Sequence, residues 1–265
     1  MKLVLLGTTG YHPTNERQTA CMMLPELGVV LDAGTGLFRV RRRLQTDHLD
    51  IFLTHAHLDH VMGLTFLFDV LHEKKGMVAR VHGEPAKLAA IREHLFAPEI
   101  FPVLPPLEFV PLLPEVKLRD DYRLTWFPLT HPGGSIGYRI DGPHGSLAYV
   151  TDTTADLKAD YVEKIRGVDV LIHECYFADG QEQLATLTGH SCLSPVAEVA
   201  RAAEVGRLIL VHVNPFDDYV RCLSLTEAKQ IYRAMVLAED EMEIDVVRPG
   251  STLPARPVAA VPKAS

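Results

Sequence analysis

Cysteine, excess positive charge and long apolar runs are all scarce in this 265-residue sequence, and each scarcity argues against a class of protein. The four cysteines include no C-x-x-C pair, so neither a zinc finger nor a disulfide framework is indicated. We expect reduced, mostly buried thiols in a cytoplasmic protein. No apolar run approaches the roughly 20 residues that a membrane helix requires, so no membrane partner is expected. The cysteines are Cys21, Cys175, Cys192 and Cys222.

Basic residues are outnumbered by acidic ones, 26 to 34, which gives a formal net charge of -8. A large nucleic-acid interface normally needs a basic face, and therefore none is expected here. A small anionic substrate is compatible with this balance, because bound metal ions can outweigh the net charge locally.

The N-terminal apolar run covers four residues, 3–6, and ends in Gly7-Thr8-Thr9-Gly10. It is too short for a signal peptide and is interpreted as a buried first strand. With 47% hydrophobic residues the chain can bury a sizeable core. We expect one domain over residues 1–253, followed by a disordered Pro/Ala-rich tail at 254–265.

Short strand-like runs dominate the first part of the chain and alternate with helical patterns later. This mixture predicts an α+β protein with a four-layer αββα sandwich. Segment 98–114 holds six prolines and is expected to form neither regular helix nor central strand. It is interpreted either as a surface connection or as a wall beside a substrate pocket. The predicted strands are 2–6, 28–31, 50–53, 78–81, 124–129, 135–140, 147–150, 168–172, 207–213 and 243–247. The predicted helices are 61–68, 85–95 and 194–205, the last capped by Ser194.

The densest group of chemically active residues is His55-Ala56-His57-Leu58-Asp59-His60. It follows the apolar run 51–53, so four metal-binding side chains gather at one strand end. His55 and His57 alternate and point to the same side in an extended backbone. Asp59 and His60 are expected on the following loop and diverge from that direction, which indicates two adjacent metal ions.

Two ions need further ligands, and three more apolar runs each deliver a suitable residue at or near their ends. His131 follows 126–130, Asp152 follows 148–151 and His212 follows 208–211. A residue of this kind is by itself more often part of a turn or of the core. Together, however, the three complete the ligand set of two metal ions.

The motif resembles the HxHxDH signature of the metallo-β-lactamase superfamily, and the resemblance extends over nearly the whole chain. It implies that His55, His57 and His131 bind a first metal ion and that Asp152 bridges both ions. It implies further that Asp59, His60 and His212 bind the second ion.

Thr188-Gly189-His190-Ser191 is similar to a motif of the ribonuclease Z-like phosphodiesterases, and residues 131–139 resemble a small bacterial branch that includes cyclic-phosphate phosphodiesterases. True ribonuclease Z enzymes carry a transfer-RNA-binding arm between the third histidine and the bridging aspartate. His131 and Asp152 are only 21 positions apart, which leaves no room for that arm.

The predicted function is hydrolysis of small or cyclic phosphodiesters by hydroxide formed at a dinuclear metal site. The expected cofactors are two divalent ions, zinc first because the ligands are rich in imidazole, with manganese or iron as alternatives. Asp59 and His190 are the catalytic candidates, with His190 protonating the leaving oxygen. Asp32 and Glu174 are assigned behind the ligands, although Asp32 is equally well explained as a turn residue and Glu174 as structural.

Four other functions are alternatives: ribonuclease Z-like RNA processing, lactone or ester hydrolysis on the same scaffold, a di-iron oxidoreductase and a non-catalytic scaffold. The last is disfavoured because no ligand position is lost. A di-iron oxidoreductase ranks low because position 57 is histidine. The other histidines, including His12, are expected on the surface or in packing, and the sequence leaves open whether the chain forms a homodimer.

Overall fold

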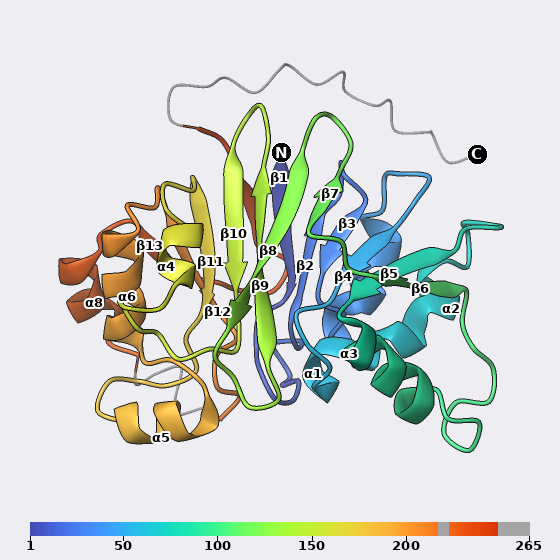
Figure 1. The fold of residues 1–265 in the computed structure, drawn as a ribbon, viewed down its shortest axis with the longest axis horizontal. Coiled ribbons are helices and arrows are strands. Elements are labelled where there is room, and N and C mark those ends of the chain that lie inside the picture. Colours follow the sequence, from blue (N-terminus) through green and yellow to red (C-terminus); the bar gives the residue numbers. More distant parts are fainter. Residues whose placement is uncertain (217–222, 249–265) are drawn as a thin grey trace.

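Two seven-stranded sheets pack face to face in the computed structural model, which describes residues 1–216 and 223–248 (Figure 1). Helices lie on the outer side of each sheet, with α4, α6 and α8 on one side and α1, α2 and α3 on the other. The predicted α+β, four-layer αββα sandwich is confirmed. The expected tail at 254–265 and Cys222 lie outside the described residues.

The first sheet is built mainly from the N-terminal half, and a late strand closes one edge of it. Its order is β14-β1-β2-β3-β4-β5-β6, with β3 to β6 parallel. The strands are β1 (Lys2–Gly7), β2 (Cys21–Leu24), β3 (Val29–Leu31), β4 (Asp50–Phe52), β5 (Ala79–Gly83), β6 (Leu107–Pro111) and β14 (Glu243–Asp245).

The second sheet has the order β13-β12-β11-β10-β9-β8-β7. Strands β7 to β10 form an antiparallel meander, and β10 to β13 are parallel. The strands are β7 (Glu115–Lys117), β8 (Arg123–Leu129), β9 (Ser135–Asp141), β10 (Ser146–Val150), β11 (Val170–Glu174), β12 (Leu208–Val211) and β13 (Met235–Leu237).

Both sheets are apolar on their two faces because each lies between the other sheet and a helical layer. In β1, Leu3 and Leu5 enter the core between the sheets, whereas Val4 and Leu6 enter the core under the helices. This alternation is the period of two that an extended chain imposes. Burying both faces explains why the strands appear in the sequence as continuous apolar runs.

The helices start and stop differently from the sequence prediction at two places. The expected helix 61–68 is a broken run that begins at Leu58, so Asp59 and His60 lie in a first helical turn and not on a preceding loop. The helix expected from Ser194 begins at Leu193 after Cys192, and the Ser194 hydroxyl bonds Asp179 instead of capping. The helices are α1 (Leu58–Val61), η2 (Met62–Phe66), α2 (Leu67–Val70), α3 (Pro85–Ala90), η3 (Ile91–Leu95), η1 (Thr35–Arg42), α4 (Tyr161–Lys164), α5 (Glu182–Thr188), α6 (Leu193–Ala202) and α8 (Leu225–Ile231).

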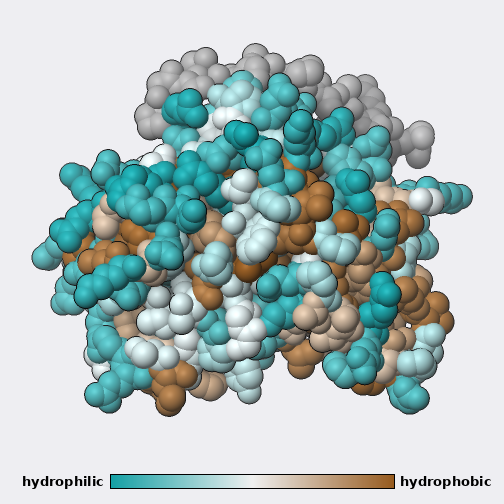
Figure 2. Space-filling view, viewed as in Figure 1, coloured by the Kyte–Doolittle hydropathy of each residue, from teal (hydrophilic) through white to brown (hydrophobic). Residues whose placement is uncertain are grey.

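The proline-rich segment is not only a connection, because it contributes β6 to the edge of the first sheet. An edge strand tolerates proline since one side of its backbone needs no ladder partner. Before β6, Ile100 lines an apolar groove of about 320 Å³ with Leu58 and Ile91. Figure 2 shows apolar side chains in several places on this face, among them the lower right, where α1 and α3 lie in Figure 1.

The cysteines that the structure describes, Cys21, Cys175 and Cys192, are buried free thiols, as expected. Within residues 1–216 and 223–248, no helix has the length and apolar character that crossing a bilayer would require.

Candidate metal centre

The strand ends of both sheets meet along one edge of the sandwich, and the metal-binding side chains lie there. Strands β3 and β4 of the first sheet lead to Asp32 and to the histidine motif. Strands β8, β10 and β12 of the second sheet lead to the remaining members. The structure therefore brings together all seven predicted ligands: His55, His57, Asp59, His60, His131, Asp152 and His212.

The first group of donor atoms comes from His55, His57, His131 and Asp152, and these atoms lie within 4.8 Å of one another. Nε2 of His131 is 3.3 Å from Nδ1 of His57. Oδ2 of Asp152 is 3.4 Å from Nε2 of His55 and 3.6 Å from Nε2 of His131. His57 is exposed, so this group lies at the mouth of the site.

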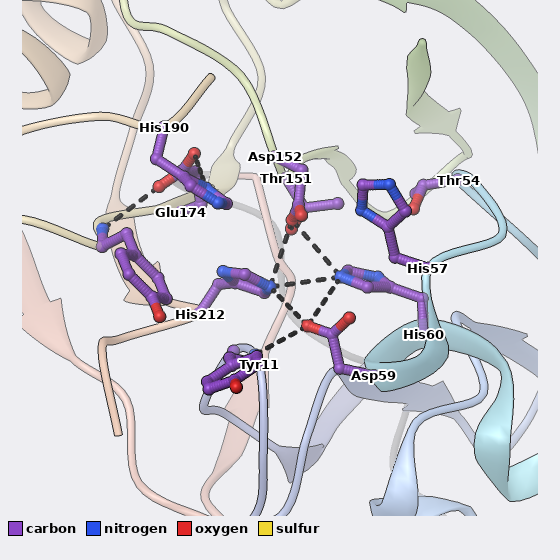
Figure 3. A network of polar contacts seen from close by, with 12 residues as sticks. Tyr11, Thr54, His57, Asp59, His60, Thr151, Asp152, Glu174, His190 and His212 are labelled. Atoms are coloured by element: carbon purple, nitrogen blue, oxygen red, sulfur yellow. Dashed lines mark hydrogen bonds and ion pairs between the residues drawn. The ribbon is translucent and has the colours of Figure 1, made fainter. Parts of the chain in front are cut away.

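The second group comes from Asp59, His60 and His212, and it is more enclosed. Nε2 of His60 and Nε2 of His212 are 3.1 Å apart, and Nε2 of His212 is 3.3 Å from Oδ2 of Asp59. Oδ1 of Asp152 lies 3.3 Å from His60 and 3.2 Å from His212. The two oxygens of Asp152 thus face the two groups separately, as a bridging ligand requires. Figure 3 shows the side of Asp152 that faces His60 and His212.

The hydrogen bonds behind the rings determine which nitrogen faces the centre. Nδ1 of His131 lies 2.9 Å from the Gly189 carbonyl, which can only accept, so this nitrogen carries the proton. Nδ1 of His60 is likewise paired with a carboxylate oxygen of Asp32 at 2.8 Å. Their Nε2 atoms therefore face the centre, and each offers a lone pair there when the ring carries a single proton.

His55 shows the same arrangement most clearly. The Thr54 hydroxyl donates to Asp32, so it accepts from Nδ1 of His55 at 3.0 Å. Nε2 of His55 is buried and has no hydrogen-bond partner. A buried unpaired nitrogen is costly, and a cation between the converging lone pairs and carboxylates would satisfy it. The donor set fits divalent metal ions.

Charge in the centre is consistent with that fit. Burial, and then the nearby His60, lowers the pKa of His55, and burial also lowers the pKa of His57 and His131. These histidines are neutral and ready to bind metal at neutral pH. Burial alone would raise the pKa of Asp152, but the neighbouring His212 and His60 hold it well below its usual range.

Three residues of the centre adopt backbone conformations that are uncommon for side chains larger than glycine. Asp32, Asp152 and His212 have φ values of 59°, 45° and 53°, in the left-handed region. Each lies just after a strand, where this conformation ends the extended chain abruptly. Such strain persists where surrounding structure holds it in place, and it is concentrated at functional sites.

The Asp32 carboxylate lies buried behind the second group. Its contacts show that its role is not limited to stabilising a turn. It accepts hydrogen bonds from the Thr54 amide at 2.8 Å and from the Tyr149 hydroxyl at 3.0 Å, and it pairs with His60. It is fully buried. This carboxylate fixes both the orientation and the protonated nitrogen of His60.

Glu174 supports His190 in the way that Asp32 supports His60. The sequence alone left this role of Glu174 undecided. Oε1 of Glu174 lies 3.0 Å from Nδ1 of His190 and accepts from the Thr153 amide at 3.0 Å. Its other oxygen accepts from the amides of Tyr176 and Ser191. One buried carboxylate thus ties the His190 loop to the strand end that carries Asp152.

His190 lies beside the second group, with its ring stacked on His212 at 5.5 Å. One of its ring nitrogens is within 4.8 Å of donor atoms of Asp152 and His212. Burial would lower the pKa of His190, but Glu174, together with the carboxylates of Asp152 and Asp59, raises this pKa to about 8. The imidazole is therefore largely protonated at neutral pH.

The sequence prediction missed the segment that follows β1. A Cβ on Gly10 would lie 2.3 Å from Cε1 of His212, so only glycine fits against that ring. The Tyr11 amide donates to Oδ2 of Asp59 at 2.8 Å. The local sequence gives no sign of these contacts with His212 and Asp59. Gly7-Thr8-Thr9-Gly10 indicates only that a strand ends there.

Comparison with known proteins agrees with this geometry. A sequence model described as the beta-lactamase superfamily domain matches residues 28–213. Ribonuclease Z of Haloarcula marismortui is 26% identical, covering 92% of this chain and 96% of that protein. The alignment spans 303 residues, more than the 265 of this chain, so that relative contains segments which this chain lacks.

Two solved structures share the fold. The metallo-beta-lactamase fold protein YhfI from Bacillus subtilis superposes with a TM-score of 0.75 at 20% identity, covering 92% of this chain and 98% of that chain. A diphosphatase from the PhnP family superposes with a TM-score of 0.70 at 17% identity, covering 92% and 97%. These structures show the shared fold, and the ribonuclease Z relative together with the matched superfamily model confirms the resemblance to the ribonuclease Z-like branch.

Proposed function

The chain belongs to the beta-lactamase superfamily, and from that membership we propose that it is a metal-dependent phosphodiesterase acting on small or cyclic phosphodiesters. The observation that carries the proposal is Asp152, whose two oxygens face two separate groups of donor atoms. Beside it lies a histidine that can deliver a proton. Two metal sites next to a proton donor suit displacement at phosphorus.

We propose that His55, His57 and His131 hold one ion, that Asp59, His60 and His212 hold the other, and that Asp152 contacts both. Zinc is the proposed metal, because five of the seven ligands are imidazoles. Bound divalent ions would lower the pKa of a water molecule towards about 7 and offset charge on the phosphate oxygens.

His190 is the proposed proton donor to the leaving oxygen. Its contact with Glu174 places the proton on Nδ1 of the neutral ring and stabilises the doubly protonated form. With a pKa raised to about 8, the ring carries a proton to donate at neutral pH. After transfer, Glu174 still holds the ring in place through Nδ1. Asp59, which the Tyr11 amide orients, is proposed to act through the second ion.

The proposed substrate is small because the chain between His131 and Asp152 is short. It forms only the hairpin of β9 and β10, joined by residues 142–145. No extended arm leaves the body there, and the net charge is -8. Both features favour a small phosphodiester over a precursor transfer RNA.

A ribonuclease activity is the second candidate, because several relatives, including that of Haloarcula marismortui, are named ribonucleases. Those names run counter to the expectation of no large nucleic-acid interface. We also propose a cytoplasmic location, which the buried free thiols of Cys21, Cys175 and Cys192 support.

The test combines metal analysis with a substrate panel. The purified protein, loaded with zinc, manganese or ferrous iron, should bind two ions per chain. It should hydrolyse bis(p-nitrophenyl) phosphate and nucleoside 2′,3′-cyclic phosphates, but not lactones, thioesters or precursor transfer RNA at comparable rates. Efficient cleavage of a lactone with inert phosphodiesters would overturn the proposal, and efficient 3′ cleavage of a precursor transfer RNA would establish the second candidate.

A further inference from the structure

An apolar groove of about 320 Å³ opens beside the mouth of the metal centre, between α1 and the helical run of α3 and η3. Ala56 and Leu58 both line it, and these residues are the two chain neighbours of the exposed ligand His57. The groove therefore begins next to a residue of the first group. Pockets that bind small molecules measure roughly 300–1,000 Å³, so this groove is large enough for one substituent of a small substrate.

The proline-rich segment forms one wall of the groove, which is the second of the two roles that its sequence allowed. Ile100 lines the groove and is 70% exposed. The next residue, Phe101, anchors the segment, because its ring packs edge-on against Phe96 at 5.5 Å and stacks with Phe68 at 6.4 Å. The anchored segment holds Ile100 in place without burying it.

Another wall of the groove contains a widened helical turn. The Phe96 amide donates to the carbonyl of Ile91, five residues earlier, at 3.2 Å, whereas an α-helix uses the carbonyl four residues earlier. Turns of this kind are rare and occur frequently at functional sites. Three residues of the turn, Ile91, His94 and Leu95, line the groove.

Lys87 lies where the groove meets the metal centre. It precedes Ile91 and His94 by four and seven positions, so the three side chains follow one face of the helical run. A Cβ on Gly133 would lie 3.9 Å both from Nζ of Lys87 and from Nε2 of His57. Lys87 donates to the Gly133 carbonyl, and no carboxylate in the described part of the chain pairs with it. Its positive charge is therefore available to an anion at the mouth.

The two neighbouring regions suit the two ends of one ligand. The metal centre and Lys87 attract an anion, whereas the apolar groove disfavours a charged group. Leu58 and Ile100 are 62% and 70% exposed, and an apolar group lying between them would remove their surface from water. A phosphodiester with an apolar ester group meets both requirements.

The position of His190 indicates which ester group lies in the groove. Figure 3 shows His57 and His190 on opposite sides of Asp152. Because His190 is the proposed proton donor to the leaving oxygen, the leaving group lies on its side. The ester group on the side of His57 is then the one that stays on the phosphate.

We infer that the groove binds the apolar ester group, alkyl or aryl, that a phosphodiester substrate retains after cleavage. The inference rests on the proposed phosphodiesterase function and narrows its substrate class. It assigns a binding role to Ile100 and to the widened turn, neither of which the metal centre requires.

The test uses alkyl p-nitrophenyl phosphates, which share one leaving group and one charge and differ only in the retained ester. Attack of hydroxide on phosphorus releases p-nitrophenolate and leaves the alkyl group on the product phosphate. With the metal-loaded enzyme, kcat/KM should rise by up to about 60-fold from the methyl to the butyl ester, about fourfold for each buried CH₂ group. The 2-methoxyethyl ester, which has the shape of the butyl ester but is more polar, should lose most of this gain.

The variant Ile100→Gln should reduce the ratio of kcat/KM for the butyl and methyl esters, because it places an amide in the apolar wall. Ile100→Leu keeps the wall apolar and should keep the ratio. The control is Val78→Gln, the same kind of change at an exposed residue that precedes β5 and does not line the groove, and it should leave the ratio as in the wild type. Both positions are exposed, so the substitutions should have little effect on stability.

A second measurement does not depend on turnover. Butylphosphonate and methylphosphonate contain no ester bond, so a phosphodiesterase cannot cleave them. In the zinc-loaded protein with ¹³C-labelled isoleucine methyl groups, butylphosphonate should shift the NMR signal of Ile100, and methylphosphonate should not. The spectrum of Ile100→Gln identifies this signal by its absence.

The outcomes separate the two proposals. If the wild type cleaves all the esters with equal kcat/KM, the phosphodiesterase stands and the inference about the groove fails. If no ester is cleaved, the proposed function fails, and the two phosphonates still decide for or against the groove. An Ile100 signal that butylphosphonate leaves unchanged would overturn the inference. So would a flat ester series in a protein that light scattering shows to be a dimer and that Ile100→Gln converts to a monomer, because a second copy of the chain would then occupy the groove.

Discussion

The two groups of donor atoms differ in how firmly the protein holds them. In the second group His60 is fully buried, and Asp32 behind it is fixed by Thr54 and Tyr149. In the first group His57 is exposed, and Nδ1 of its ring lies 3.3 Å from Nε2 of the neighbouring His131. The second group is enclosed by the core, whereas the first group reaches the mouth of the site through His57.

This difference indicates that the two halves of the centre have different roles. An enclosed, pre-oriented half favours tight binding of one ion. An open half favours exchange and leaves a coordination position that a substrate can reach. Substitutions in each half should therefore differ in their effects on metal content and on hydrolysis.

Replacing His60 by glutamine should abolish measurable hydrolysis and remove the second ion. Glutamine keeps a hydrogen-bond donor for Asp32, so the buried carboxylate is not left unpaired. The matched variant His57→Gln, in the open half, should retain at least one ion and residual activity. Metal content per chain and initial rates measure both effects.

An equal loss of metal in His60→Gln and His57→Gln would show that the protein holds the two halves equally firmly and would contradict the difference described above. A first ion that stays bound in His60→Gln would show that the two halves bind their ions independently.

Replacing His190 by alanine should lower the rate by about 10²–10⁴ for substrates with poor leaving groups, while both ions remain bound. The loss should be smaller with nitrophenyl esters, because nitrophenolate departs without a proton. Steady-state kinetics on the two ester types, with metal analysis, measures this. Loss of an ion would instead make His190 a ligand, which its proximity to Asp152 and His212 permits.

Asp32→Asn should weaken the second ion by about 10- to 100-fold, the usual effect of removing a carboxylate that supports a metal-binding histidine. The first ion should keep its affinity, since Asp32 supports His60 most directly. Chelator competition that resolves two sites measures both constants. A matched control is Asp50→Asn, the same change in a buried carboxylate at the start of β4, and it should alter neither constant.

Asp50→Asn has the smallest effect and acts on stability alone. Asp50 accepts a hydrogen bond from Nε2 of His82 at 2.6 Å and also pairs with Arg80, and losing these bonds should cost about 1–3 kcal/mol of unfolding free energy at pH 7.

The same contacts predict a pH dependence. Burial would raise the pKa of Asp50, but His82 and Arg80 outweigh burial and lower this pKa. The stabilisation is therefore complete above the unfolded pKa of about 4 and is lost as pH falls through the lower folded value. Urea unfolding at pH 7 and in steps to pH 3 should show the wild type and the variant converging. A constant difference over that range would contradict the assignment.

Several strands and two helix starts were not predicted correctly from the sequence, and particular residues show why. The short strands β2, β6, β7 and β13 lack a strong pattern of their own and are specified by their neighbours in the sheets. The start of α6 was misplaced because Ser194 finds Asp179, a partner distant in sequence, and does not cap. Local propensity cannot anticipate such a competing partner.

The sandwich and the residue types of the centre follow from the sequence alone. Apolar runs that end in histidine or aspartate are local features, and the motif from His55 to His60 lies within six residues. The folded structure was needed to show which oxygen of Asp152 faces which group, that Glu174 holds His190, and that Tyr11 borders Asp59. These relations join segments such as Thr9 and Val213, which are neighbours only after both sheets have closed. A periodic pattern encodes which face of a strand is buried, whereas the meeting of distant strand ends depends on how the two sheets pack together.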